Sequence, residues 1–435
     1  MLVSFSVGNY LSFKDIQMLS LTADALKELP DNLHTPFLYD GEERLLKSVA
    51  LYGHNSHGKT NLVKAFRFFQ RLVFTSFTRG QTTDNIELEP FRLDTTMAGK
   101  PSYFELCFLI KETKYRYEVL ATNTQILQEG LYYSQAKIRE NHLFQRDAQS
   151  FRVSRQWNRD NDQKVESMLP FAKPTVLLLS VLLSQENFTV IGDVGHWLRN
   201  NLVVPDNYLL ELQHARAIYS DPEYTGLILK FIESADLGFK TIFDKLAAIK
   251  SSRPALQQGF LNMAFEREIK DFELFTRHSV YDQARKEVGK IEFELMKDES
   301  AGSIKYFIIV CLLAYAIRHS QLIWIDELDS RFHALLLEML VSSFHNPIIN
   351  PINSQLIFTT HNTHLLDQKL RQLRRDQMVV VEKNEWGESS IARAHTVENP
   401  VRIGKSLEKE YKKGNLGGIS KKIKRDLGPT LFDNL

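Results

Sequence analysis

The sequence predicts an α/β fold with an antiparallel β subdomain and a mostly helical insertion. Near the start, a short apolar run has the length of a buried strand, and apolar residues at helical spacing follow it from Thr60. Beyond residue 290 helical and strand patterns alternate, with a helix over about 303–318, a strand over 321–325, a helix over 332–344 and a strand over 355–359.

The middle of the chain differs from both ends. Residues 103–155 are rich in Phe, Tyr, Leu and Val with polar breaks, which is typical of an antiparallel meander. The following stretch shows helical patterns at 176–183 and 209–219 and few strand signals. We therefore expect an N-terminal lobe over 1–155, a helical insertion over 156–290 and a C-terminal lobe over 291–435.

Shorter elements complete the prediction. Residues 1–20 alternate between apolar and polar types around a turn at 9–13, which indicates two short strands. The apolar run over 49–52 is the buried strand and ends at Gly53. A final hairpin is expected over 377–393, and a basic tail follows from Arg402 to Arg425.

Composition excludes several classes of protein. The 435 residues include 54 basic and 53 acidic side chains, so the net charge of +1 gives no global case for nucleic-acid binding. Two distant cysteines exclude a disulfide scaffold and fit a reducing cytosol. The N-terminus has no signal-peptide pattern, and the longest apolar run, 304–317, is too short to span a membrane. We expect a cytoplasmic protein without membrane contact.

The strongest local signal is a full match to the phosphate-loop pattern G-x-x-x-x-G-K-[ST], formed by Gly53, His54, Asn55, Ser56, His57, Gly58, Lys59 and Thr60. Glycines let backbone N–H groups converge on phosphates, and the N-terminus of the following helix adds positive potential. Lys59 is expected to reach the β- and γ-phosphates and Thr60 to bind Mg²⁺. The required strand before the loop and helix after it are both predicted.

A second signal lies 268 residues beyond Gly58, where an apolar strand ends in Asp326 and Glu327. Asp326 is expected to hold Mg²⁺ through water, and Glu327 to polarise the attacking water. An acidic strand end before a helix is common by itself, but a complete phosphate loop in the same chain favours the catalytic interpretation. Two strands of one sheet must then be separated by a large insertion.

Two further segments are candidates for phosphate contacts. Ser300 and the backbone of Gly302, at the start of the apolar helix, can donate to an anion, although Ser-Ala-Gly-Ser is also an ordinary helix start. His361 comes just after the strand at 355–359. A neutral imidazole there can bond both a phosphate and the attacking water.

The chain resembles the RecF/SMC-related ABC-type P-loop ATPases, and within them the compact bacterial AAA-15/AAA-21 ATPases of phage defence. That group includes the AbiL/RloA-type abortive-infection ATPases and the ATPase subunits of the PARIS and Septu or retron systems. The matching segments are Asn9 to Lys14, the phosphate loop with Asn55, Pro90 to Leu93, Glu299 to Gly302, Ile325 to Asp329, Thr360 to Asn362 and Lys412 to Gly418.

The resemblance implies a homodimer, or an assembly of dimers, that closes around ATP and Mg²⁺. Ser300 and Gly302 would contact the ATP of the other subunit, His361 would be the switch residue, and residues 328–331 would form the D-loop at the dimer interface. The group also implies slow ATP hydrolysis in abortive infection. There the ATPase would control an effector, such as a nuclease or toxin from a neighbouring gene, with DNA or a phage-derived molecule as trigger.

Three features depart from the group. His57 stands where Ser or Gly is usual, which would slow hydrolysis or tune nucleotide choice. The signature segment of the group, residues 300–303 in this chain, reads Ser-Ala-Gly-Ser rather than Ser-Gly-Gly-Gln. No clear Q-loop glutamine is present, and Gln81 is the nearest candidate.

Two other functions remain open. A RecF-like role in DNA repair needs a basic channel, which Lys369, Arg371, Arg374, Arg375 and the tail lysines could supply, although a solvated charged face is the favoured explanation of these residues. A scaffold that holds ATP without turnover is disfavoured by the complete acidic pair. The run from Val379 to Glu382 resembles the start of a Toprim nuclease but is better explained as part of the final hairpin.

Overall fold

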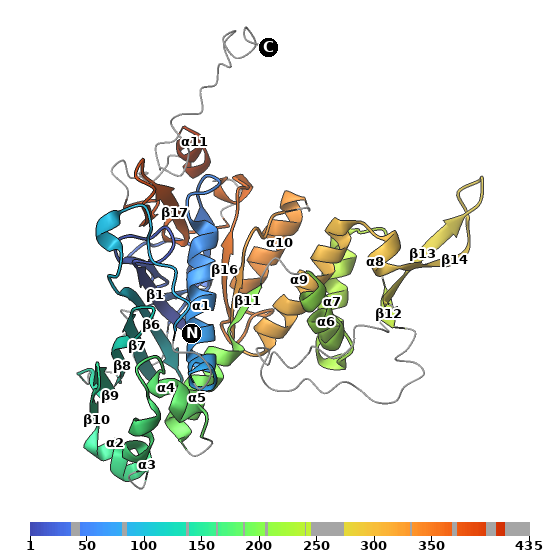
Figure 1. The fold of residues 1–435 in the computed structure, drawn as a ribbon. Coiled ribbons are helices and arrows are strands. Elements are labelled where there is room, and N and C mark those ends of the chain that lie inside the picture. Colours follow the sequence, from blue (N-terminus) through green and yellow to red (C-terminus); the bar gives the residue numbers. More distant parts are fainter. Residues whose placement is uncertain are drawn as a thin grey trace, which may run out of the picture.

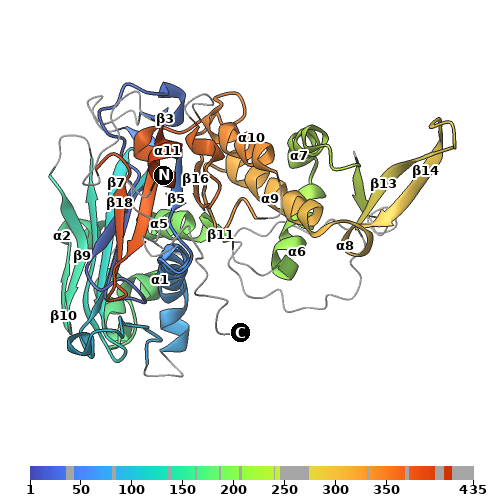
Figure 2. The same ribbon diagram turned by 90° about the horizontal axis from the view of Figure 1, so that it is seen from above.

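A computed structural model describes residues 1–35, 44–80, 85–135, 139–161, 164–185, 188–204, 208–239, 241–244, 274–330, 333–367, 372–396 and 406–413. Two sheets face each other with the long helix α1 (Lys59–Arg79) between them, as Figures 1 and 2 show. Further helices cover the outer face of one sheet, and a hairpin projects from the side of the molecule.

The central sheet contains the strands that lead into the predicted motifs. Its order is β11-β15-β16-β5-β17-β18, and all neighbouring strands are parallel except the last pair. The strands are β5 (Ser48–Tyr52), β11 (Leu202–Val204), β15 (Leu322–Ile325), β16 (Gln355–Thr359), β17 (Met378–Lys383) and β18 (Ser389–Arg393). Because these strands are parallel, the segments after β5, β15 and β16 emerge at one edge of the sheet.

This sheet is buried on both faces, which explains its unbroken apolar strands. In β15, Leu322 and Trp324 belong to the core beneath α1, whereas Ile323 and Ile325 belong to the core on the opposite face. The same alternation holds in β5, β16 and β17. The expected strands at both ends of the chain are therefore confirmed as neighbours in one sheet.

The second sheet is antiparallel, in the order β10-β9-β8-β7-β6-β1-β2. Its strands are β1 (Leu2–Gly8), β2 (Gln17–Ser20), β6 (Ser102–Ile110), β7 (Thr113–Ala121), β8 (Ile126–Ser134), β9 (Asn141–Asp147) and β10 (Ser150–Val153). This confirms the predicted meander and places the N-terminal strands beside it. Aromatic rings of α1 fill the space between the sheets, with ring centres 5.4 Å apart for Phe69 and Phe104 and 5.3 Å apart for Phe66 and Trp324. These contacts hold α1 with its first residue, Lys59, at the edge of the central sheet where the segments after β5, β15 and β16 emerge.

The other face of the central sheet is covered by α9 (Ala301–Arg318) and α10 (Ala334–His345), and α6 (Tyr208–Tyr219) and α7 (Pro222–Ala235) pack on α9. The helix α9 is long and apolar enough to cross a membrane, but 72% of it is buried inside the protein. It is the core helix predicted from residues 304–317.

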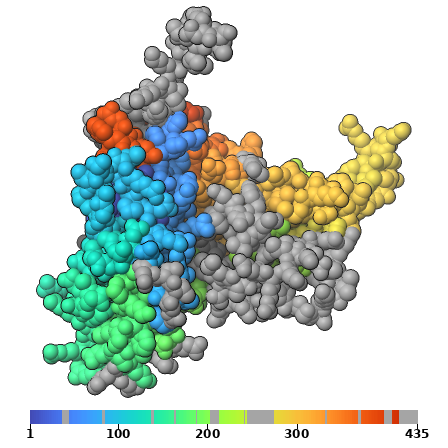
Figure 3. Space-filling model, viewed as in Figure 1, coloured from blue at the N-terminus to red at the C-terminus, as the bar shows by residue number. Residues whose placement is uncertain are grey.

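The predicted insertion is helical only in part. It contains α2 (Arg155–Asp160), α3 (Lys164–Met168), α4 (Leu178–Leu183), α5 (Thr189–Asn200), α6 and α7, but also β11, which joins the central sheet. A small sheet of β12 (Ile242–Asp244), β13 (Leu274–Tyr281) and β14 (Glu287–Glu294) follows, and the expected boundary at 290 falls inside β14. A short α8 (Leu295–Asp298) links this sheet to α9. The β13–β14 hairpin projects from the body in Figures 1 and 3.

The second half of β14 explains why this part of the insertion is not helical. Ile291 and Phe293 alternate there with Lys290, Glu292 and Glu294, a period of two that suits a strand more than a helix. The short pair β3 (Leu33–His34) and β4 (Leu45–Leu46) completes the described strands.

A buried histidine predicts loss of stability in acid. His345 is held near Ser48 and Gln377, and burial, with Lys47 nearby, lowers its pKa to about 3. Since the unfolded residue binds a proton near pH 6.5, stability is complete above that pH and falls by about 1.4 kcal/mol per unit below it. Urea unfolding at pH 7 and pH 5 should show a loss of about 2 kcal/mol that His345→Gln reduces. An equal loss in both proteins would contradict this assignment.

Candidate nucleotide site

The loops after β5, β15 and β16 enclose an open cavity of about 520 Å³. Its lining consists of His54, Asn55, Ser56, His57, Gly58, Lys59, Thr60, Asn61, Asp326, Glu327 and His361. The structure thus brings the phosphate loop together with the acidic pair and His361, which lie far from it in the sequence.

The loop before α1 has the shape of an anion cradle. Ser56 and Gly58 have φ angles of 67° and 112°, in the left-handed region, and no side chain caps the N-terminus of α1. A Cβ atom on Gly58 would overlap the hydroxyls of Ser389 and Ser12. A glycine is therefore needed at this position, and the free end of a 21-residue helix faces the cavity.

Lys59 lines the cavity and contacts three neighbouring groups. Its ammonium donates to the carbonyl oxygens of Gly53 at 2.7 Å and His54 at 3.3 Å, and lies 3.2 Å from Nε2 of His361. Burial lowers the pKa of Lys59, while Asp326 and other nearby carboxylates oppose that shift. A cation surrounded mainly by neutral acceptors is well placed to receive phosphate oxygens.

Thr60 and Asp326 form a pair of hard oxygen ligands. The Thr60 hydroxyl donates to one Asp326 oxygen at 2.8 Å, and Thr359 donates to the other at 2.6 Å. Hydroxyl and carboxylate oxygens are the protein ligands that Mg²⁺ prefers, usually with several waters retained. The residues present therefore fit the expected metal. The role of Thr359, at the end of β16, was not foreseen from the sequence.

Glu327 is held by its backbone while its side chain faces the cavity. Its φ angle is 50°, and its N–H donates to the Thr359 hydroxyl at 2.7 Å. From α9, the Lys305 ammonium donates to the Glu327 carbonyl at 2.8 Å and to the Ser330 hydroxyl. These contacts hold a backbone conformation that is rare for a residue with a side chain.

Removing the Lys305 ammonium should therefore slow any hydrolysis without weakening ATP binding. We expect Lys305→Met to lower kcat by about 10-fold or more, because a small displacement of a catalytic group is costly. Steady-state phosphate release and equilibrium ATP binding test this, with Lys305→Arg as the conservative variant. A variant with unchanged kcat would show that Glu327 keeps its position without this contact.

His361 lies beside Lys59 at the end of β16. Its backbone N–H donates to Asp329 at 3.2 Å. Burial and then the neighbouring Lys59 charge lower the pKa of His361, although Asp329 and Glu327 oppose the shift. The neutral imidazole can accept from Lys59 or from a water molecule, as a switch histidine requires.

The signature residues lie elsewhere in the protomer. Ser300 caps α9 by accepting from the Ser303 N–H, and neither Ser300 nor Gly302 lines the cavity. The preceding Glu299 accepts from Thr276 at 2.5 Å and lies 2.6 Å from His278 Nε2 on β13. The Ser300–Gly302 segment is therefore not part of the cavity of its own protomer.

Two serines outside the motif support the phosphate loop. Ser389 of β18 can donate to the His57 carbonyl at 2.7 Å, and Asn61 donates to the Ser12 hydroxyl at 2.8 Å. The two serine hydroxyls also lie 2.8 Å apart. Ser12 belongs to the Asn9–Lys14 segment used for the family resemblance, and its role here is to brace the loop.

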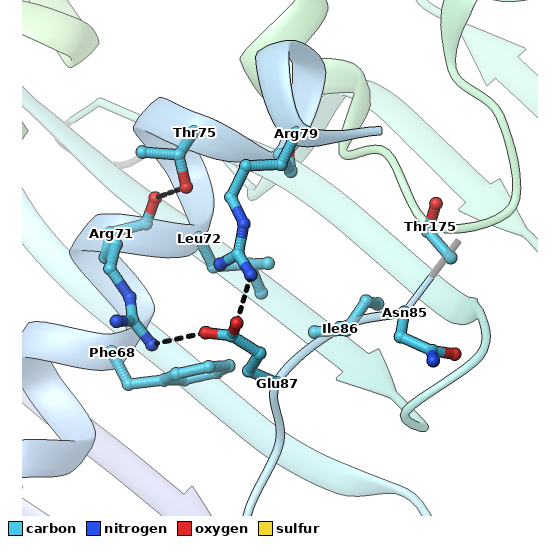
Figure 4. Close-up of a pocket in the computed structure, with 10 residues that line it drawn as sticks. Phe68, Arg71, Leu72, Thr75, Arg79, Asn85, Ile86, Glu87 and Thr175 are labelled. Carbon is cyan, nitrogen blue, oxygen red and sulfur yellow. Dashed lines mark hydrogen bonds and ion pairs between the residues drawn. The ribbon is translucent and has the colours of Figure 1, made fainter. Parts of the chain in front are cut away.

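A second hollow lies at the other end of α1 (Figure 4). Arg79 and Arg71 approach Glu87 at 2.6 Å and 3.5 Å there, beside Phe68 and Ile86. Its lining includes none of the predicted phosphate or metal ligands. The candidate Gln81 lies outside the described residues.

The proposed basic channel is not supported by the arginines that the structure describes. Arg374 is completely buried against Asp376, so it is neither a DNA contact nor part of a solvated face. Arg375 pairs with Glu28 at 2.7 Å. Lys369 and Arg371, like most of the basic tail, lie outside the described residues. The run at 379–382 is part of β17, which confirms the final hairpin.

One family of known proteins matches most of the chain. Residues 48–367 match the family described as "AAA domain, putative AbiEii toxin, Type IV TA system". No curated protein matches. With the sheet topology, the family match confirms an α/β ABC-type P-loop fold with an antiparallel β subdomain.

Two solved structures are similar at low identity. The recombination mediator protein RecF-ATPrS of the RecFOR pathway is 11% identical, with 90% of this chain and 98% of that chain covered and a TM-score of 0.30. The Smc head domain with a coiled coil and joint from Pyrococcus yayanosii is also 11% identical, with 90% and 96% covered and a TM-score of 0.32. Neither likeness is close enough to assign a function.

Proposed function

Because the chain belongs to the AAA-domain family described as a putative AbiEii toxin of type IV toxin–antitoxin systems, we propose that it is an ATPase whose nucleotide state controls a partner protein in phage defence. The observation that carries the ATPase proposal is the convergence of Lys59, the Thr60–Asp326 pair, Glu327 and His361 on one cavity. The defence role and the effector, a nuclease or toxin, rest on the sequence resemblance.

Each residue has a separate task in this proposal. The phosphate loop, from Gly53 to Thr60, binds the phosphates, and Lys59 neutralises the β- and γ-phosphates. Mg²⁺, when bound, neutralises charge on the phosphate oxygens. Glu327 orients a water molecule and accepts its proton as the water attacks the γ-phosphorus. The bond from that phosphorus to the bridging oxygen then breaks, and ADP and phosphate leave.

The placement of Ser300 and Gly302 outside the cavity supports a dimeric site. In this proposal each α9 N-terminus completes the cavity of the other protomer, so ATP bridges two chains. Hydrolysis removes the γ-phosphate that links the two chains, so the closed dimer is no longer stabilised. The protein would then act as a nucleotide-dependent switch. The effector would respond to whether the dimer is closed or open.

The test is Glu327→Gln, which keeps the size of the side chain and removes its basicity. We expect phosphate release to fall by about 100-fold or more, because general base catalysis contributes that much. ATP should remain bound and should favour a dimer in light scattering. Glu385→Gln, at an exposed position of the final hairpin, is the matched control.

Wild-type turnover in Glu327→Gln would contradict the assigned base. A monomer in saturating ATP would contradict the shared site. The repair alternative predicts a different result, namely DNA binding by the isolated protein that weakens steeply with salt. Stable co-purification with the product of a neighbouring gene would favour defence.

A further inference from the structure

The C-terminal helix α11 (Leu407–Lys412) lies outside the matched range but packs beside the nucleotide site. Figures 1 and 2 both place it near the central sheet. The Tyr411 side chain is only 5% exposed, and Leu407 is also buried. This helix therefore has a fixed seat on the body of the protein.

One side of that seat is the start of the phosphate loop. The ring of Tyr411 meets the ring of Tyr52, the last residue of β5, edge to face at 5.4 Å between centres. The backbone of Gly53 also lies close enough to the Tyr411 phenol to oppose the rise in its pKa that burial causes. Gly53 in turn accepts from Lys59. The helix thus packs against the residue that precedes Gly53, whose carbonyl accepts from Lys59.

The other side of the seat is the segment just after His361. Glu408 accepts from the Thr363 hydroxyl at 3.2 Å. The Tyr52 hydroxyl donates to the Asn362 carbonyl at 3.1 Å. Two hydrogen bonds therefore hold the two residues that follow His361. Thr363 is bonded to Glu408 of α11, and Asn362 is bonded to Tyr52, whose ring packs on Tyr411.

We propose that α11 is a positioning element for ATP hydrolysis, in which Tyr411 supports the phosphate loop and Glu408 holds the His361 segment against Lys59. Tyr411 and Glu408 are positioning residues, because neither lines the cavity. The inference rests on the proposed function and adds a means of control. Anything that lifts α11 from its seat slows hydrolysis at a distance from the nucleotide.

The charge state of His361 reports this positioning. The groups that act on it are Lys59 of α1, His54 of the phosphate loop, and Glu327 and Asp329 after β15. Partial burial and Lys59 keep the imidazole neutral. If the segment loosens, the ring becomes hydrated and moves from Lys59, so its pKa rises toward the ordinary value. The neutral form acts above that pKa, so the acid limb of the rate profile must move to higher pH.

The experiment compares the full-length wild type with Tyr411→Ala and Thr363→Val. We expect kcat to fall by about 10- to 100-fold in both variants, since small misplacements of catalytic groups have effects of that size. ATP affinity should change less than kcat, and the acid limb should shift upward. Tyr411→Phe keeps the ring contact and should recover much of the rate. Lys409→Ala, on the exposed face of α11, is the control.

NMR titration of the His361 ring in the same proteins, assigned with His361→Gln, does not need turnover. An upward shift of the His361 pKa in Tyr411→Ala and Thr363→Val supports the inference. A fall in kcat with an unmoved acid limb and an unmoved His361 titration would overturn it, as would wild-type behaviour in both variants. Absence of hydrolysis in the wild type would instead refute the proposed function, and the NMR comparison would still decide whether α11 governs His361.

Discussion

Lys59→Ala is expected to weaken ATP binding by at least about 100-fold. Removing one member of a desolvated charge pair costs about 2–5 kcal/mol or more, and each 1.4 kcal/mol is a factor of ten in affinity. In the free protein Lys59 contacts two carbonyls and the neutral His361 rather than a carboxylate, within hydrogen-bond distance. The ammonium can therefore bind a phosphate without first breaking a direct ion pair with a carboxylate.

The same contacts predict that the substitution leaves the free protein folded. Burial lowers the pKa of Lys59, so folding does not gain from its charge. We expect the melting temperature without nucleotide to be unchanged or higher, and the stabilisation by ATP and Mg²⁺ to disappear. Calorimetric titration and thermal unfolding measure both effects. Lys64→Ala, on the exposed face of α1, is the control and should bind ATP normally. Equal affinity in the two variants would remove Lys59 from the site.

Of the proposed single substitutions, Asp376→Ala should lower the free energy of unfolding most. Asp376 and Arg374 are completely buried and joined by two hydrogen bonds of 2.8 Å each. Asp376 also accepts from the Asp24 N–H at 2.9 Å. Without the carboxylate, a buried guanidinium keeps only backbone carbonyls as partners, among them those of Leu26 and Glu28. Breaking a buried pair in this way costs about 3–5 kcal/mol.

Urea unfolding measures this loss, with Glu385→Ala as an exposed acidic control. Replacing both partners, as in Arg374→Met with Asp376→Leu, should be much milder than Asp376→Ala, because no uncompensated charge remains. A single variant as stable as the control would mean that water reaches Arg374. The pair joins the segment after β2 to the start of β17, so the N-terminal region should loosen first.

The chemistry of the site was predictable because it depends on local runs of sequence. The phosphate loop from Gly53 to Thr60 is continuous, and Asp326 and Glu327 end a strand with apolar residues on both faces. The insertion was less predictable. β11 is only three residues long and is defined by its partner β15, which is distant in sequence. The roles of Thr359 and Ser389 depend on strand neighbours, which a single sequence does not show.

The clearest error of the prediction from sequence concerned a charged residue, Arg374. Arg374 stands among other basic residues in the sequence, and such a run usually faces solvent. Its burial depends on Asp376 and on carbonyls of residues about 350 positions earlier in the chain. Lys305 interrupts the apolar run 304–317, and its ammonium donates to Glu327 and Ser330 outside the helix. This role was not predicted from the sequence.

The position of β16 between β5 and β15 has a consequence for biosynthesis. A nascent chain that has emerged only as far as residue 350 already carries Lys59 and Asp326, but it lacks the strand that lies between theirs. It also lacks Thr359 and His361, which join those residues in the finished site. We therefore expect ATP to bind only after nearly the whole central sheet has left the ribosome, so that the nucleotide stabilises completed molecules and not prematurely terminated ones.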